Sequence, residues 1–287
     1  MPGFINVIRN TLTELAGPDQ SAPAVLPAGL PEAVLPVANA GVALLTDYQG
    51  AAYAQLYCDR LRRFVGRRGV DDALFGEIAR LLAERMAYHD AIRIAQLKLR
   101  EPPRHGRAAV DVRRFRCDEL LSALPAIVGE PLLWAVERIG CSHRTVPIRF
   151  SNAGWWSLLR LRGEASLRRS RRLSVRYATE RVWVGRWLHM IDRALTRQPD
   201  AAGAVVQTAS MIEGYGTGYR HGVAAWHQII DGLAKPVFDG GLLLPDLAAA
   251  ITQASHAPRD PKGDELRKII AEIRAGALLP SSPVEGG

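Results

Sequence analysis

Apolar positions recur at helical spacing over most of the chain. Between Val37 and Phe64 the large apolar side chains fall three to five residues apart, which places them along one broad helix face. Gly66-Arg67-Arg68-Gly69 follows, and glycine beside terminal arginines is typical of a helix end. The pattern therefore predicts a helical segment that ends before residue 70.

The next stripe is the clearest in the sequence. Asp71 or Asp72 is placed to cap its first turn, since aspartate accepts hydrogen bonds from the free N–H groups there. Pro102-Pro103 stops it, because proline cannot continue a helix. The apolar side is formed by Leu74, Ile78, Leu81, Leu82, Met86, His89, Ile92 and Leu99. This spacing predicts one long amphipathic helix up to Leu99.

Beyond residue 103 helical patterns alternate with a little strand character. Val110 and Val112 alternate with polar residues, and Thr145–Phe150 is short and β-rich, so one or two short strands are expected. Helices are expected at Asp118–Leu124, Pro131–Ile139, Leu173–Thr196, Ala202–Leu233, Pro245–Ser255 and Asp264–Arg274. The predicted fold class is mainly α: a multi-helix, bundle-like domain with at most one or two short β-strands.

Proline and terminal composition divide the chain into three parts. Residues 1–36 predict a short helix, Phe4–Ala16, and then an arm in which prolines recur every four or five residues. Residues 37–275 form the predicted helical domain. Residues 276–287 are expected to be a flexible tail.

Composition predicts a cytoplasmic protein with reduced thiols. No apolar stretch reaches the roughly 20 uninterrupted residues of a membrane-spanning helix, and the N-terminus lacks a basic and an apolar signal region. The chain has three cysteines, Cys58, Cys117 and Cys141, and no CxxC motif. An odd number of widely spaced cysteines argues against a disulfide framework. An iron–sulfur cluster normally takes four thiolates. We therefore expect no cofactor and no metal on this chain, and no membrane partner.

The glycine run at 214–218 resembles a phosphate loop only superficially. Gly214 and Gly216 are followed by Tyr219 where a dinucleotide fingerprint has its third glycine, and no Gly-Lys-Ser/Thr is present. The preceding residues are helical in character. We interpret the run as a helix break or a close contact between helices.

Arginine carries the chain's excess charge. The formal net charge is +8, and between Arg160 and Arg186 nine arginines face only Glu164 and Glu180. Tryptophans nearby could stack on bases, or they could be core residues of a helix. The run could thus be a solvated or subunit-docking face, a nucleic-acid surface, or a site for an anionic lipid or cofactor tail. Its candidate anion patch is Arg168, Arg169, Arg171, Arg172 and Arg176.

The histidines do not form a catalytic or metal-binding pattern. His89 and Asp90 are adjacent, so on a helix they point about 100° apart and do not converge. No H-x-x-x-H or H-E-x-x-H spacing occurs, and no G-x-S-x-G turn is present. Nothing here predicts a self-sufficient enzyme.

Several short strings, in the right order and at matching separations, carry a family resemblance. They are Asp47–Ala54 (DYQGAAYA), Leu56–Leu61 (LYCDRL), Arg85–Asp90 (RMAYHD), Ile92–Lys98 (IRIAQLK), Gly214–Thr217 (GYGT) and Arg220–Gly222 (RHG). The chain resembles, from about Pro36 to about Ala275, the helical C-terminal region of the indolepyruvate:ferredoxin oxidoreductase beta-subunit family. The Leu124-Pro125 turn and the arginine-rich Leu173–Arg181 stretch are part of the resemblance.

That resemblance implies a two-subunit enzyme that oxidatively decarboxylates aryl pyruvates to acyl-CoA and passes electrons to ferredoxin. It places thiamine diphosphate and the iron–sulfur clusters on a partner alpha subunit. The gamma-type 2-oxoacid oxidoreductase domain of that family does not fit in the first 36 residues of this chain. The chain is accordingly expected to be the product of a split gene, a stand-alone relative or a fragment, and to act as an accessory subunit or domain. Its expected partners are the thiamine-dependent alpha subunit, a gamma-type domain, or both.

The resemblance supplies no catalytic residue, so the candidate site rests on where the matching strings meet. We expect Tyr48–Tyr57, Tyr88–Lys98 and Gly214–His221 to converge as an interface or a modest ligand pocket. Its candidate residues are Asp47, Tyr48, Tyr53, Tyr57, Tyr88, His89, Asp90, Lys98, Tyr215, Arg220 and His221. The alternative is a nucleic-acid-binding or other anion-binding module built on Arg160–Arg186.

Overall fold

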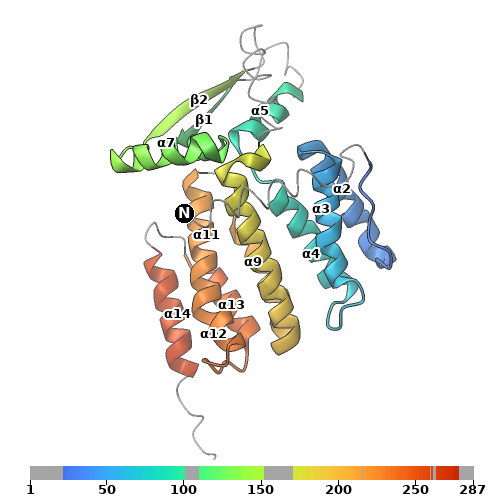
Figure 1. Cartoon of the computed structure of the whole chain (residues 1–287). Coiled ribbons are helices and arrows are strands. Elements are labelled where there is room, and N and C mark those ends of the chain that lie inside the picture. Colours follow the sequence, from blue (N-terminus) through green and yellow to red (C-terminus); the bar gives the residue numbers. More distant parts are fainter. Residues whose placement is uncertain are drawn as a thin grey trace, which may run out of the picture. The chain divides into compact units, whose positions relative to one another are not determined.

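The structure, a computed structural model, describes residues 22–100, 110–151, 171–214, 216–258, 260 and 263–277. It consists mainly of α-helices, with one antiparallel pair of strands in these ranges (Figure 1). The predicted fold class is thus confirmed. The predicted domain 37–275 contributes to two compact units. Unit 1 comprises Met1–Val65 and Leu82–Val184, and unit 2 comprises Gly66–Leu81 and Gly185–Gly287.

Unit 1 holds the N-terminal helices and the strand pair. Its elements in chain order are η1 (Glu32–Val34), α2 (Leu35–Tyr48), α3 (Ala51–Leu61), η2 (Arg62–Phe64), α5 (Ala91–Arg100), β1 (Val110–Arg116), α6 (Cys117–Ser122), α7 (Ala126–Arg138) and β2 (Thr145–Ser151). The helices α4 (Asp72–Met86) and α9 (Val175–Arg197) contain the boundaries between the units. Asp71 caps α4 as predicted, since its Oδ1 accepts the Leu74 N–H at 2.8 Å.

The helical segment after Val37 is two helices. Gly50 separates α2 from α3 with a φ of 118°, a conformation that side chains disfavour. The two helices then pack closely, because Gly41 of α2 leaves room for the Tyr57 ring of α3. A Cβ at Gly41 would lie 2.6 Å from the Tyr57 hydroxyl oxygen.

The prediction of a single long helix between residues 72 and 99 is wrong. The chain forms α4 up to Met86 and α5 from Ala91, with residues 87–90 between them. The apolar stripe continues through both helices, with Ile78, Met86 and Ile92 all buried. Periodicity alone could not show the break, because side chains from other elements bind the backbone there, as described below.

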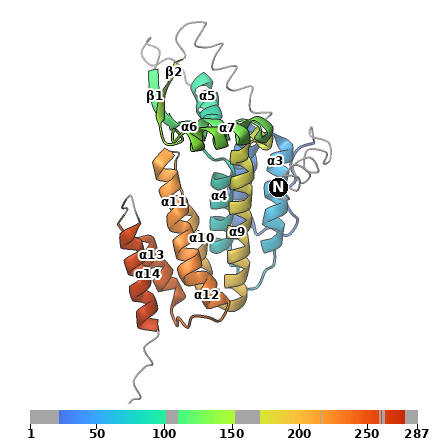
Figure 2. The same ribbon diagram turned by 60° about the vertical axis from the view of Figure 1, so that its left-hand side comes forward.

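The two predicted strands are confirmed. β1 and β2 pair antiparallel from Val110↔Ser151 to Arg116↔Thr145. Phe115 and Phe150 are buried, with ring centroids 6.1 Å apart. β2 also contacts α5, which lies beside the sheet (Figure 2).

The helix predicted at Pro131–Ile139 begins five residues earlier, at Ala126. Pro125 precedes it and forms an isolated antiparallel bridge with Ser174. Gly129 is its only buried residue, and a Cβ there would lie 2.9 Å from the Leu121 carbonyl oxygen. Pro131 lies inside the helix. Proline is typical of the first turn of a helix, so the sequence predicted the start at Pro131, whereas in the structure Pro131 is the sixth helical residue and gives no N–H to the Ile127 carbonyl.

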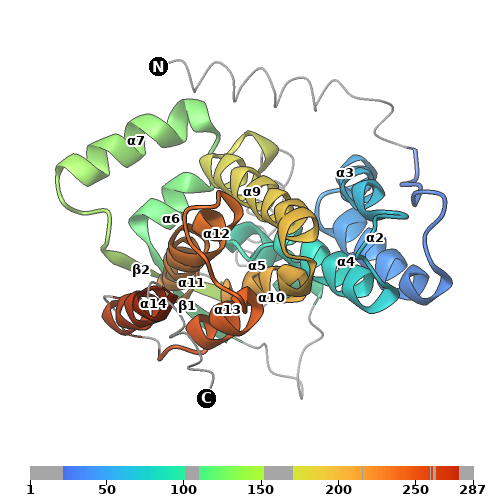
Figure 3. The ribbon, with the colours of Figure 1, turned by 90° about the horizontal axis from the view of Figure 1, so that it is seen from below.

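Unit 2 contains the C-terminal helices. Its elements after α9 are η4 (Pro199–Ala201), α10 (Ala202–Gln207), η5 (Thr208–Met211), α11 (Gly216–Ile229), the π-helical turn η6 (Ile230–Ala234), α12 (Lys235–Phe238), α13 (Leu247–Ser255) and α14 (Asp264–Ala277). α11, α13 and α14 lie side by side (Figure 3). Asp246 caps α13 by accepting the Ala249 N–H at 2.8 Å.

The glycine run breaks a helix, as the sequence predicted. The predicted stretch Ala202–Leu233 is interrupted between η5 and α11, where Gly214 and Gly216 have φ values of 70° and 72°. Gly222, one turn and a half into α11, lies against the backbone of Met211. This glycine therefore allows the close contact between η5 and α11.

Replacing Gly222 with alanine is expected to destabilise the protein by about 1–3 kcal/mol, because the new Cβ would overlap the Met211 carbonyl oxygen. Gly218→Ala is the matched control in the same helix, since a Cβ there has no atom within 4 Å. That change should be neutral or stabilise by up to about 1 kcal/mol through helix propensity. Urea unfolding of both variants measures the difference, and equal effects would contradict the close contact.

Some predictions fall on residues outside the described ranges, in whole or in part. The predicted helix Phe4–Ala16 lies there, as does the segment with Trp155-Trp156. Of the predicted arm, residues 22–31 contain no helix, and η1 and α2 begin at Glu32 and Leu35. Of the predicted tail, residues 276 and 277 complete α14.

Candidate functional site

Unit 1 contains a buried cluster of tyrosines from four segments. Tyr48 ends α2, Tyr53 begins α3, Tyr88 lies between α4 and α5, and Tyr177 lies in the first turn of α9. All four side chains are buried. The Tyr48 ring centroid lies 6.0 Å from that of Tyr53 and 5.8 Å from that of Tyr88, and Tyr53 lies 6.1 Å from Tyr177. Two of the three strings that we expected to converge therefore meet here.

Arg171 lies against this cluster and forms a bidentate ion pair with Asp90. Its Nε lies 2.9 Å and its Nη2 3.1 Å from the two carboxylate oxygens. Its Nη1 donates to the Tyr48 carbonyl oxygen at 3.2 Å and to Gln49 Oε1 at 3.1 Å. The guanidinium carbon lies 4.1 Å from the Tyr48 ring centroid, within cation–π range. Arg171 is only 1% exposed. Its charge and hydrogen-bond donors are therefore matched by partners inside the protein.

The same cluster explains the break between α4 and α5. The carbonyl groups that end a helix need donors, and the Tyr53 hydroxyl donates to the Met86 oxygen at 3.0 Å. The Tyr48 hydroxyl donates to the Tyr88 oxygen at 3.1 Å. Asp90 then caps α5, since its Oδ1 accepts the Arg93 N–H at 2.6 Å. Donors from α2 and α3 thus replace the hydrogen bonds that a continuous helix would have made.

Asp47 and Arg93 extend the network. Arg93 Nη1 lies 2.9 Å from Asp47 Oδ2, and its guanidinium lies 5.5 Å from the Tyr48 ring centroid. A second buried carboxylate, Glu180, lies 3.0 Å from Arg176 and 3.6 Å from Arg85. Periodicity did not single out Arg93, Arg85 or Glu180, because a buried charge is recognisable only when its partner, far away in sequence, is known.

The ionisable side chains of this cluster have shifted pKa values. Burial raises the pKa of Tyr48 and of Tyr88 well above the usual value, and burial likewise raises the pKa of Tyr53. The phenols therefore stay protonated near neutral pH. His89 is exposed, and partial desolvation, followed by the Arg93 charge, lowers its pKa. The arrangement clamps backbone segments together and contains no paired nucleophile and base among the described residues.

The other predicted site residues lie elsewhere. Tyr57 packs on Gly41, and Lys98 is buried in α5. Arg220 and His221 are in α11 of unit 2. Tyr215 lies outside the described residues.

The predicted anion patch is not an exposed face where the structure describes it. Arg171 and Arg172 are buried, and Arg176 is paired with Glu180. The sequence could not predict this burial, because a run of arginines does not show which of them form ion pairs with carboxylates in the fold. Arg168 and Arg169 lie outside the described residues. The described part of the patch therefore offers no site for a nucleic-acid phosphate.

The cysteines and acidic residues do not form a metal site in the described structure. No three His, Cys, Asp or Glu side chains in it could hold a metal ion. The three thiols are free, with Cys58 buried in α3. Burial raises the pKa of the Cys58 thiol to about 11, so it is protonated near neutral pH. In the same ranges no helix has both the length and the apolar character to cross a membrane.

The helix α7 presents an apolar face to solvent. Trp134 is 64% exposed, Ile127 74% and, just after the helix, Ile139 70%. Val128 and Leu132 are exposed as well. The sequence predicted this helix but not its exposure, because a stripe of apolar residues normally marks the side that faces a core.

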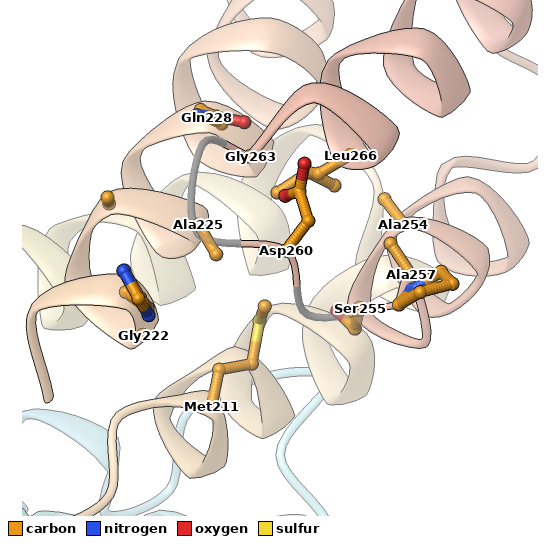
Figure 4. A pocket seen from close by; sticks show the side chains of 13 residues that line it. Met211, Gly222, Ala225, Gln228, Ala254, Ser255, Ala257, Asp260, Gly263 and Leu266 are labelled. Carbon is orange, nitrogen blue, oxygen red and sulfur yellow. The ribbon is translucent and has the colours of Figure 1, made fainter. Parts of the chain in front are cut away.

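A pocket in unit 2 lies between α11, the end of α13 and the start of α14 (Figure 4). Its cavity measures about 120 Å³. His221 and Gly222 line it on α11, and Asp260, Gly263 and Leu266 line it on the opposite side. Of the candidate site residues, His221 is the one that contributes to a pocket of unit 2.

Comparisons with known proteins give one result. A model of a family of unknown function (DUF6537) matches residues 34–232. This match includes α2 to α11, and therefore the tyrosine cluster and α7, while α13 and α14 follow it. Comparison with curated proteins and with solved structures found no match.

Proposed function

The chain belongs to the family of unknown function DUF6537, and on this premise we propose that it is a docking module without catalysis of its own. It serves as an accessory subunit or domain of an indolepyruvate or aryl-pyruvate:ferredoxin oxidoreductase-like complex. Thiamine diphosphate and the iron–sulfur clusters belong to the partner subunit. The observation that carries the docking role is the exposed apolar face of α7.

The geometry of α7 supports this role. Successive helix residues turn by about 100°, so two neighbouring rows of its exposed residues form one apolar arc. One row contains Val128, Leu132 and Ile139, and the other contains Ile127 and Trp134. Pro131 and Ala135 lie between the rows, and Arg138 is the one charged residue within the arc. A cluster of exposed apolar side chains on one helix face favours an interaction surface, whereas single exposed apolar residues are ordinary.

The start of the helix is held in place, and α6 packs against α7. Pro125 pairs with Ser174 just before α7 begins, and a Cβ at Gly129 would lie 3.4 Å from a methyl group of Val175. The anchoring segment starts at Arg171, which the Asp90 ion pair holds. The buried cluster thus supports the segment from which α7 extends, while the apolar arc of the helix is exposed.

The partner we propose is the thiamine-dependent alpha subunit, through an apolar groove with a basic rim. Glu130 and Glu137 lie on α7 outside the apolar arc, and both are exposed. Basic groups on the partner would complement these carboxylates and fix the orientation of the helix. Trp134, with Arg138 over its ring at 5.6 Å, is the expected centre of the contact.

Replacing Trp134 with alanine is expected to weaken binding to the alpha subunit at least 30-fold, the effect of losing a central aromatic anchor of about 2 kcal/mol. The measurement is co-purification of the full chain with that subunit, followed by titration of the two. Folding should be unchanged, because an exposed side chain contributes little to stability.

Val182→Ala is the matched control, since Val182 is also exposed, at 70%, on α9 of unit 1. Its binding should equal that of the natural sequence. Equal loss in both variants would point to a general effect on the surface. Absence of any complex with an alpha subunit would remove the proposed function.

A further inference from the structure

The pocket of unit 2 has the construction of a small-ligand site. Small side chains line it on two sides, with Ala224 and Ala225 on α11 and Ala254 and Ala257 at the end of α13. These alanines leave a hollow where larger apolar residues would fill the space between the helices. A cavity of about 120 Å³ is close in size to the engineered apolar cavity of about 150 Å³ that binds benzene. It therefore suits a group the size of one ring.

Gln228 places an unsatisfied polar atom at this hollow. Its Oε1 is buried and has no hydrogen-bond partner among the described residues. A buried carbonyl oxygen without a donor destabilises the folded protein, so a donor supplied by a ligand would relieve that penalty. The Gly263 backbone approaches this amide closely, since a Cβ there would lie 3.0 Å from Gln228 Nε2.

Asp260 decides the charge that the pocket favours. Its side chain lines the pocket on the loop before α14 (Figure 4), and its Oδ2 accepts the Asp264 N–H at 2.8 Å. Burial raises the pKa of the Asp260 carboxyl, but hydrogen bonds from the backbone N–H groups of Asp264 and Gly263 and their neighbours together outweigh it and lower the pKa, so the carboxyl is ionised near neutral pH. Ser255 is neutral, and Arg267 is engaged with Asp264 on the outer side.

We propose that this pocket binds a small molecule with a ring-sized apolar body that carries one ammonium or N–H donor. The alanine walls hold the apolar part, Gln228 accepts the hydrogen bond, and the Asp260 carboxylate favours a cation and disfavours an anion. The site lies in unit 2, while the proposed docking helix lies in unit 1. Ligand binding and partner binding can therefore fail independently.

The test uses the full chain and three probes of similar shape: benzylamine, toluene and benzoate. Chemical-shift titration should show saturable benzylamine binding, with a dissociation constant of roughly 1–10 mM for a ligand of this size. Toluene should bind at least about tenfold more weakly, and benzoate should not bind. Benzoate or toluene binding as tight as that of benzylamine would overturn the proposed donor recognition.

Substitutions in the pocket test whether benzylamine binds there. Ala225→Leu fills the hollow and should abolish benzylamine binding, while Ala271→Leu, an equal change on the exposed surface of α14, should leave it unchanged. Gln228→Met keeps the length of the side chain, removes the acceptor and should reduce benzylamine binding to the level of toluene. If Ala225→Leu binds benzylamine like the natural sequence, or if no probe saturates, the proposed site is wrong.

Discussion

Replacing Arg171 with methionine should lower the free energy of unfolding by about 3–5 kcal/mol, the usual cost of breaking a buried ion pair by removing one partner. The change leaves the Asp90 carboxylate in the interior without its two donors. It also removes the donor to the Tyr48 carbonyl oxygen. Urea unfolding followed by circular dichroism measures the loss.

Two further variants show whether the pair is the cause. Arg267→Met breaks a pair with Asp264 in which both side chains are more than half exposed, so it should cost no more than about 1 kcal/mol. Combining Arg171→Met with Asp90→Asn removes both charges, keeps an Oδ1 that can cap α5, and should recover part of the loss because no unpaired charge is left buried. A loss below about 1 kcal/mol for Arg171→Met would show that the pair does not hold α4, α5 and α9 together.

Raising the pH above about 10 should unfold the protein in one steep step. Burial raises the pKa of Tyr48, Tyr53, Tyr57 and Tyr88 in the folded state, while the same phenols ionise near pH 10 when unfolded. The unfolded state therefore releases protons first. The stabilisation is fully present below pH 10 and is lost as the pH rises further. Each tyrosine contributes a slope of about 1.4 kcal/mol per pH unit, and the four together about 5 kcal/mol per unit.

The measurement follows tyrosinate absorption and helical circular dichroism in the same alkaline titration. The two signals should change together, because the buried phenols ionise only as the chain unfolds. Tyr53→Phe should reduce the slope by about 1.4 kcal/mol per pH unit, and it should also lower stability at neutral pH because the Met86 carbonyl loses its donor. Tyrosinate absorption that rises well before the helices are lost would mean that these side chains are accessible in the folded protein.

Local sequence patterns were enough to predict the helical class, most of the helices, the strand pair and the helix caps that depend on nearby residues. Asp71 and the turn at Gly214 and Gly216 are examples. A cap or a positive φ is decided within a few residues, and the spacing of apolar side chains follows directly from the geometry of a helix or a strand.

Tertiary structure decided where helices end when distant residues bind their carbonyl groups. The break between α4 and α5 depends on Tyr48 and Tyr53, and no local pattern contains that information. The tertiary structure also determines which arginines are buried, because Arg171 pairs with Asp90, 81 residues away in the sequence. For the same reason the apolar stripe of α7 was recognisable while its exposure was not. Periodicity shows that a helix has an apolar side, and only the packing of the other elements determines whether that side faces a core, a ligand or a partner.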